Sequence, residues 1–192
     1  MEVVILSGSK PIAALAADAI QALLRRKPNA VLGLATGSSP LPVYDELALR
    51  HERDGLDFSR VHAFALDEYV GLTPGHPESY REVIRREFTE RVNIAPSNVH
   101  GPDGSAADIP AACQAFEDAM RAAGGVDLQL LGVGTDGHIA FNEPGSSLAS
   151  RTRIKTLVEQ TRRDNARFFG SLSKVPHHVV TQGLGTILEA RH

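Results

Sequence analysis

Short apolar runs alternate along this chain with longer segments whose apolar residues recur at helical spacing. The runs occupy residues 3–6, 30–35, 61–66 and 128–131, and each has the length of a buried strand. Strands that alternate with helices are typical of parallel sheets, because each parallel connection has to cross over the sheet. The pattern therefore predicts an α/β fold with a doubly wound (Rossmann-like), mostly parallel sheet and helices on both faces.

The remaining elements follow from periodicity and from the residues that start and stop helices. Helical patterns are expected at residues 9–27, 40–50, 78–92, 109–123, 164–169 and 185–190. Further extended segments are expected at residues 99–100, 154–158 and 179–183. Ser9 and Ser79 are candidate N-caps, because a serine oxygen can accept from the free N–H groups of a first helical turn.

Length and composition narrow the class of protein. A chain of 192 residues with 42% hydrophobic residues favours a single domain, 1–192, with a real core. A net charge of −3 gives no indication of a nucleic-acid partner or an anionic membrane partner. The single cysteine, Cys113, excludes an intrachain disulfide framework. We expect a cytoplasmic protein, because the N-terminus lacks a basic region and no apolar run reaches membrane-spanning length.

Carboxylate and imidazole side chains follow the apolar run at 128–131. Glycines in the stretch 132–144 accompany Asp136, His138 and Glu143, and ligands of open α/β sheets bind at the carboxyl ends of strands. The glycines also fit a dinucleotide fingerprint, but Pro144 interrupts the helix which that motif needs. A metal site on the same three side chains is a weaker alternative, because the set offers one nitrogen ligand; we expect no metal.

A second polar loop follows the run at 30–35. It contains Thr36, Gly37, Ser38 and Ser39, just before a helical segment that starts near Pro40. A helix N-terminus offers free N–H groups and a partial positive charge, and the hydroxyls add donors. The loop therefore predicts a cradle for a phosphate monoester. The alternative is that Ser39 merely caps the helix.

Two adjacent acids, Asp67 and Glu68, end the run at 61–66. Their side chains diverge, so we expect them to have different roles, and a capping or solvated acid is the alternative for either. The strand ends thus collect hydroxyls, carboxylates and an imidazole, which suits proton transfer on a small phosphorylated polyol. The Gly/Pro-rich segment 71–77 is long enough for a lid or a wall.

Residues 146–156 combine hydroxyl groups with three cations, Arg151, Arg153 and Lys155. A second anion site is one interpretation of this stretch. A solvated loop that leads into the strand expected at 154–158 is the other.

Several of these motifs together resemble the glucosamine-6-phosphate deaminase family. They are LDEYVGL at 66–72, HPESY at 76–80, GVGTDGHIAFNEP at 132–144, ATGSSP at 35–40 and SLASRTRIKT at 147–156. The related 6-phosphogluconolactonases share an Asp-Gly-His, but they typically continue it with Thr-Ala-Ser-Leu-Phe-Pro. The Ile-Ala-Phe-Asn-Glu-Pro found here favours the deaminases.

The resemblance implies conversion of glucosamine 6-phosphate and water to fructose 6-phosphate and ammonia, without a cofactor. Asp67 matches the base that moves the C2 proton, and His138 matches the group that opens the sugar ring, assisted by Asp136 and Glu143. The phosphate-binding positions match Thr36, Gly37, Ser38, Ser39 and Arg167. The alternatives are a 6-phosphogluconolactonase-type hydrolase and a non-catalytic sugar-phosphate sensor.

The resemblance also implies regulation, because many family members are hexamers that N-acetylglucosamine 6-phosphate activates. The effector positions of those members match Ser146, Arg153, Lys155 and Thr156, so a homo-oligomer with an allosteric site is an expectation. Family members usually continue beyond the position of His192, with another core strand and a phosphate-site lysine. We therefore expect this chain to be C-terminally incomplete.

Overall fold

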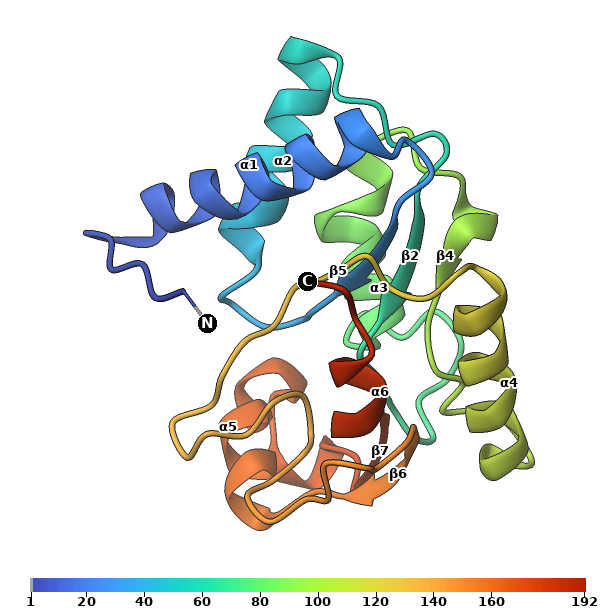
Figure 1. Cartoon of the computed structure of the whole chain (residues 1–192). Helices are drawn as coiled ribbons and strands as arrows, with labels where there is room; N and C mark the ends of the chain where they lie inside the picture. Colours follow the sequence, from blue (N-terminus) through green and yellow to red (C-terminus); the bar gives the residue numbers. More distant parts are fainter. Residues whose placement is uncertain (1) are drawn as a thin grey trace.

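A four-stranded parallel sheet forms the centre of the computed structural model, which describes residues 2–192 (Figure 1). Its order is β4-β2-β1-β5, and every neighbouring pair is parallel. The strands are β1 (Val31–Leu34), β2 (His62–Ala65), β4 (Val99–His100) and β5 (Leu128–Gln129). β5 is shorter than the predicted run, although the Leu130 N–H still donates to the Gly33 carbonyl at 2.9 Å.

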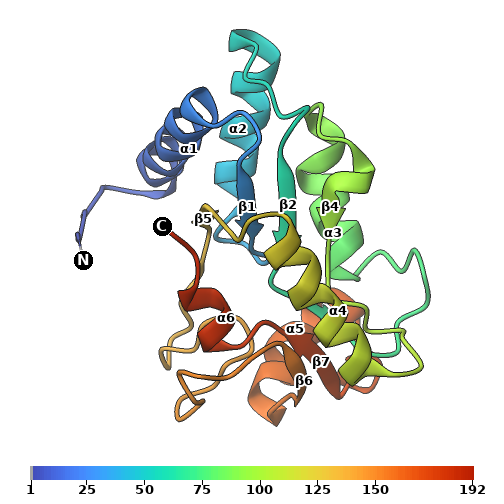
Figure 2. The same cartoon turned by 45° about the vertical axis from the view of Figure 1, so that its right-hand side comes forward.

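Helices cover both faces of this sheet, as predicted. They are α1 (Ser9–Arg26), α2 (Leu41–Asp54) and α3 (Tyr80–Glu87) on one face and α4 (Ile109–Ala122) on the other. Alternate strand residues serve the two faces, because side chains along a strand point in opposite directions. Leu32 and Leu34 pack into the core of the first three helices, whereas Val31 and Phe64 pack against Phe116 of α4. Figure 2 shows α4 set apart from α1 and α2 across the strands.

A second, three-stranded antiparallel sheet lies below the first in Figure 1. Its order is β3-β7-β6, with strands β3 (Asp67–Tyr69), β6 (Arg153–Thr156) and β7 (His178–Thr181), and it is accompanied by α5 (Glu159–Phe169) and α6 (Leu184–Leu188). The chain passes from β2 into β3 at Leu66, whose N–H donates to Leu34 while its carbonyl accepts from Gln182. The sequence predicted extended segments near β6 and β7, but it predicted neither β3 nor the antiparallel pairing of the three strands.

One predicted strand is wrong. Residues 3–6 form no strand and are exposed, with Ile5 91% exposed. In Figure 2 the segment extends outward from the N-terminal end of α1. Within residues 2–192 this apolar run pairs with no strand of either sheet.

Several helix ends differ from the prediction. α3 ends near Phe88, and the 3₁₀ turn Thr89–Arg91 replaces its predicted last turn, whereas α5 begins at Glu159 rather than at residue 164. Ser79 is confirmed as an N-cap, because its side chain accepts from the Glu82 N–H at 3.2 Å. Ser9 is not a cap, since it is already helical. Two further 3₁₀ turns are Pro96–Asn98 and Leu172–Lys174.

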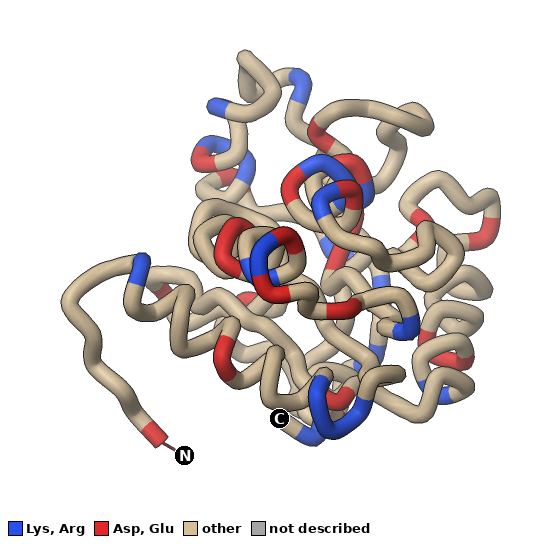
Figure 3. The backbone as a smooth tube through the Cα atoms, turned by 90° about the horizontal axis from the view of Figure 1, so that it is seen from above, with Lys and Arg blue, Asp and Glu red and all other residues tan. Residues whose placement is uncertain are grey.

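Charges are distributed without a strongly one-signed face in the view of Figure 3, where acidic and basic positions intermingle along the helices. Among residues 2–192, no helix combines the length and the apolar character that crossing a bilayer would require.

Candidate active site

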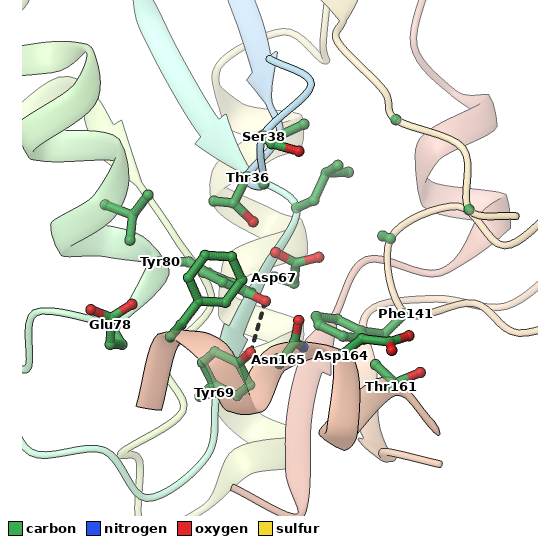
Figure 4. Close-up of a pocket in the computed structure, with 18 of the residues that line it drawn as sticks. Thr36, Ser38, Asp67, Tyr69, Glu78, Tyr80, Phe141, Thr161, Asp164 and Asn165 are labelled. Carbon is green, nitrogen blue, oxygen red and sulfur yellow. Dashed lines mark hydrogen bonds between the residues drawn. The ribbon is translucent and has the colours of Figure 1, made fainter. Parts of the chain in front are cut away.

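A cavity of about 460 Å³ lies where the two sheets meet. It is lined by the segments that follow β1 and β2, by α3, by the loop after β5 and by α5, and Figure 4 shows several of its side chains. The polar side chains in its lining are Thr36, Ser38, Asp67, Tyr69, Glu78, Tyr80, Arg86, Glu87, His138, Thr161, Asp164, Asn165 and Arg167. Of the residues singled out in the sequence, those that line this one cavity are Thr36, Gly37, Ser38, Asp67, His138 and Arg167.

The predicted phosphate cradle contributes Thr36, Gly37 and Ser38 to this lining. Gly37 has a φ of +99°, a conformation that other residues rarely adopt. Ser39 is exposed and outside the lining, and no side chain caps the N-terminus of α2. The capping alternative for Ser39 is therefore wrong, and the first turn of α2, which begins at Leu41 in the lining, keeps its positive end open to an anion.

Asp67 lies at the start of β3, 5% exposed, and lines the cavity. Its Oδ1 atom is buried without a hydrogen-bond partner. Burial, together with the charge of Glu68, raises the pKa of Asp67 to about 8, although a hydrogen bond from Thr36 opposes the shift. A carboxyl group that exchanges its proton near neutral pH is suited to acid–base work.

Glu68 has different surroundings from its neighbour. Its carboxylate accepts hydrogen bonds from the backbone N–H groups of Tyr69 at 2.8 Å, Tyr80 at 3.0 Å and Arg81 at 3.0 Å. It therefore ties the N-terminus of α3 to β3, and it lies outside the cavity lining. The two adjacent acids diverge, as the sequence suggested.

His138 lines the cavity from the loop after β5. Its Nδ1 atom lies 2.6 Å from Asp136 Oδ1, and its backbone N–H donates to the same oxygen at 3.2 Å. This backbone hydrogen bond lowers the pKa of Asp136, which is exposed and outside the lining. An Nδ1–H that donates to the carboxylate leaves Nε2 of the neutral ring free to accept a proton.

The glycines of this loop form a turn around the imidazole. A Cβ at Gly134 would lie 2.2 Å from His138 Cε1, so only glycine leaves room for the ring. The Gly134 N–H donates to the His138 carbonyl at 2.9 Å, and Gly137 turns at a φ of +89°. Residues 132–152 contain no helix, so the dinucleotide-fingerprint interpretation lacks the helix N-terminus it needs.

Glu143 completes a three-residue group with Asp136 and His138. One ligand atom from each lies within 4.8 Å of the others, and Glu143 Oε1 accepts from Thr161 Oγ1 at 3.4 Å. Glu143 is half-buried and lies outside the cavity lining. One imidazole and two carboxylates at this spacing also have the donor atoms of a cation site.

Arg167 reaches the cavity from α5. Its guanidinium carbon lies 4.7 Å from the centre of the Phe168 ring, which is a cation–π contact. Arg167 therefore lines the same cavity as the hydroxyls that follow β1.

Sequence reasoning did not single out the aromatic part of the lining. Tyr69, Tyr80, Phe141 and Phe169 form a cluster there, with Tyr69 and Tyr80 ring centres 4.7 Å apart. One available signal was the two-residue spacing of Asp67 and Tyr69, because alternate side chains of a strand point to one side. Tyr80 gave no such signal, since its position depends on how α3 returns to β3.

The predicted effector positions lie outside the cavity lining. Arg153 and Lys155 occupy one half-buried face of β6, and burial lowers the pKa of Arg153. Thr156 belongs to the opposite, exposed face and has its Oγ1 3.2 Å from His178 Nδ1. Ser146 lies in the preceding loop, where its N–H donates to the Glu143 carbonyl. The structure therefore groups Arg153 with Lys155 but turns Thr156 away from them.

Comparisons with known proteins identify relatives of this chain. A family model described as glucosamine-6-phosphate isomerases/6-phosphogluconolactonase matches residues 9–192. The chain is 84% identical over its full length to the glucosamine-6-phosphate deaminase of an Arthrobacter species and 78% identical to that of Pseudarthrobacter chlorophenolicus. It spans 74% of the length of each.

Solved structures include two informative neighbours. A monomeric glucosamine-6-phosphate deaminase superimposes with a TM-score of 0.96 at 40% identity, covering 99% of this chain and 79% of that one. A 6-phosphogluconolactonase from Thermotoga maritima reaches a TM-score of 0.68 at 25% identity, covering 94% and 76%. Of these two structures, the deaminase is therefore the more similar to this chain.

Proposed function

The chain belongs to the family of glucosamine-6-phosphate isomerases and 6-phosphogluconolactonases, and we propose that it acts in that family as a deaminase. The reaction converts glucosamine 6-phosphate and water to fructose 6-phosphate and ammonia. The observation that carries the proposal is that Asp67, a buried carboxyl with a pKa of about 8, lines one cavity with His138 and a hydroxyl cradle. The high identity to proteins named as deaminases supports the same reaction.

In the proposed mechanism His138 opens the sugar ring. Its Nε2 atom takes the proton of the anomeric hydroxyl and returns a proton to the ring oxygen, which yields the open-chain aldehyde. Imidazole suits both steps, because it gains and loses a proton near neutral pH. Asp136 holds the ring through the 2.6 Å contact at Nδ1 and stabilises its protonated form.

Asp67 then performs the isomerisation. Its carboxylate takes the C2 proton, the C–H electron pair forms a C1–C2 double bond, and the carbonyl electrons move to the C1 oxygen. Return of that proton to C1 leaves an iminium at C2, and the oxygen on C1 takes up the proton that the attacking water releases. Water adds to C2, and the nitrogen leaves as ammonia, which completes the ketose. Asp67 is suited to this shuttle because its environment keeps both of its protonation states accessible.

The hydroxyl cradle would hold the phosphate at the far end of the sugar. Thr36 and Ser38 supply hydroxyl donors, the N-terminus of α2 supplies its dipole, and Arg167 supplies a positive charge from α5. Fixing the phosphate determines which carbon meets Asp67, and such positioning can account for a large share of a rate enhancement.

An ammonia-release assay on glucosamine 6-phosphate tests the proposal. Asp67→Asn should lower the rate at least roughly a hundredfold, since it removes the base but keeps the shape. Asp45→Asn, on an exposed carboxylate of α2 outside the cavity, is the matched control and should leave the rate unchanged. Hydrolysis of 6-phosphogluconolactone without ammonia release would instead identify a lactonase. Sugar-phosphate binding without turnover would identify a sensor.

We further propose a regulatory anion site on the face of β6 that carries Arg153 and Lys155, with N-acetylglucosamine 6-phosphate as its effector. The shared face of the two cations supports this assignment, whereas Thr156 points the other way. The effector should steepen or shift the substrate saturation curve, and Lys155→Ala should abolish that response. A curve that the effector leaves unchanged rules the site out. The homo-oligomer stays a prediction, and the solved relative described as monomeric favours a single copy.

A further inference from the structure

Two phenols in the cavity have no role in the proposed mechanism. Of the three tyrosines in the chain, Tyr69 and Tyr80 line the cavity, and Tyr44 does not. The Tyr80 hydroxyl donates to the Tyr69 hydroxyl at 3.1 Å, a hydrogen bond drawn in Figure 4. Within residues 2–192, the hydroxyl hydrogen of Tyr69 has no protein acceptor. The pair therefore keeps one O–H donor for a molecule bound in the cavity.

The position of this pair is fixed from several sides. The Tyr69 ring meets Phe169 edge-on with centres 5.2 Å apart, and the Tyr80 ring lies nearly parallel to Phe141 at 6.2 Å. Glu68 adds a backbone restraint, because it accepts from the N–H of Tyr80 and so holds the start of α3. Donors that are held in advance can stabilise a developing charge without reorganising.

Asp67 lines the same cavity as the two tyrosines. Asp67 and Tyr69 are two residues apart in β3, so their side chains leave the strand on the same side. Burial raises the pKa of Tyr69 to about 12, and the hydrogen bond from Tyr80 only partly offsets that shift. Burial also raises the pKa of Tyr80 well above its ordinary value, and the charge of Asp67 adds to the shift of both phenols. Both therefore stay protonated and can act as neutral donors.

Resting on the proposed function, we propose that the paired hydroxyls of Tyr69 and Tyr80 donate a hydrogen bond to the sugar oxygen on C1, next to the carbon that Asp67 deprotonates. When the C2 proton passes to Asp67, the carbonyl electrons move to that oxygen. A phenol that keeps its own proton stabilises the resulting charge, and the proton returned to C1 still comes from Asp67. The three side chains thus divide the work: one carboxylate carries the proton, and the phenol pair holds the oxygen.

Conservative variants test this assignment, with a matched control in the third tyrosine. Tyr69→Phe keeps its ring and should lower kcat for ammonia release roughly a hundredfold, the usual effect of losing one such donor. Tyr80→Phe leaves the Tyr69 O–H in place but removes the hydroxyl that donates to it, and should lower kcat by a smaller factor. The double variant should resemble Tyr69→Phe, because the two hydroxyls act as one unit. Tyr44→Phe removes a buried hydroxyl that donates to the Ala35 carbonyl at 2.6 Å, and it should change kcat less than about twofold.

A binding measurement separates this proposal from the proposed function. Calorimetric titration with fructose 6-phosphate, run beside melting curves that verify folding, should show about tenfold weaker binding to Tyr69→Phe, and a smaller loss for Tyr80→Phe, relative to wild type and Tyr44→Phe. If wild type releases no ammonia, the deaminase assignment fails, but the fructose 6-phosphate affinities still decide the role of the tyrosines. Unchanged kcat and affinity in Tyr69→Phe and Tyr80→Phe would overturn it. An equal loss of kcat in Tyr44→Phe would do the same.

Discussion

At the scale of single residues, Asp67 links function to stability. An unfolded aspartate has a pKa near 3.9, as a rough reference value, whereas the folded environment raises that of Asp67 to about 8. Between these values the folded state binds more protons than the unfolded state, so this group makes the free energy of unfolding fall as pH rises through that window. Burial of the carboxyl that the proposed reaction uses therefore lowers the free energy of unfolding at pH values where that carboxyl ionises.

Asp67→Asn should remove that dependence, because an amide does not titrate. The melting temperature of the variant minus that of wild type should therefore increase steadily from pH 5 to pH 8. Thermal melts across this range measure the difference, with Asp45→Asn as the exposed control whose difference stays flat. A difference for Asp67→Asn that does not grow with pH contradicts the assigned environment.

The sequence predicted some of the site residues and missed others for a physical reason. Asp67, His138 and the loop from Thr36 to Ser38 were found because each lies in the segment after an apolar strand, and strand ends meet at one edge of a parallel sheet. Tyr69 and Tyr80 face the cavity because β3 pairs with β7 and α3 folds back onto Glu68. Those contacts link residues far apart in the chain, and local patterns do not encode them.

At the scale of elements, the spacing of apolar residues predicted the helices and strands that form by burying one regular apolar face. β1 and β2 and the four main helices bury regular faces, and their existence followed from the spacing of apolar residues. Residues 3–6 have the same apolar character but no neighbour, which shows that strand formation needs a partner as well as a pattern. The antiparallel sheet was missed because its strands are short and its register is set by long-range pairing.

The loop after β5 also shows what a sequence pattern does not predict. Its glycines predicted a sharp turn, and the turn is present at Gly137. The reason for Gly134 is different, since the His138 ring occupies the space where a side chain would be. A glycine in the sequence indicates where the backbone can adopt unusual conformations, but it does not indicate which neighbouring atoms occupy the space of the missing side chain.

At the scale of the whole molecule, the cavity depends on how the two sheets are joined. Gln182, fully buried, donates from its backbone to the Leu66 carbonyl at 2.8 Å and from its side chain to the Ala65 carbonyl at 3.0 Å. Asn142 in turn donates to the Gln182 carbonyl at 2.8 Å. The end of β7 is thereby fixed to the end of β2, directly beside Asp67.

A buried carboxylate makes the second connection. Glu117 of α4, 4% exposed, accepts from the Thr152 N–H at 2.8 Å and from the Thr186 hydroxyl at 2.6 Å, and it forms an ion pair with Arg151. Burial would raise the pKa of Glu117, but the hydrogen bonds outweigh it and lower the pKa. The contribution is therefore present at neutral pH and is lost as pH falls through the acid range. One side chain thus ties α4 to β6 and to α6.

Glu117→Ala should consequently destabilise the junction of the two sheets. It leaves the buried donors of Thr152 and Thr186 without their acceptor, a loss of about 3–5 kcal/mol in all at roughly 1–3 kcal/mol for each unsatisfied group, whereas Arg151 keeps Glu189. In a domain of this size that corresponds to a fall in Tm of roughly 10 °C. Glu189→Gln, which weakens the exposed side of the same Arg151 ion pair, is the control and should cost less than about 1 kcal/mol. Equal melting of the two variants would mean that α4 does not hold the second sheet in place.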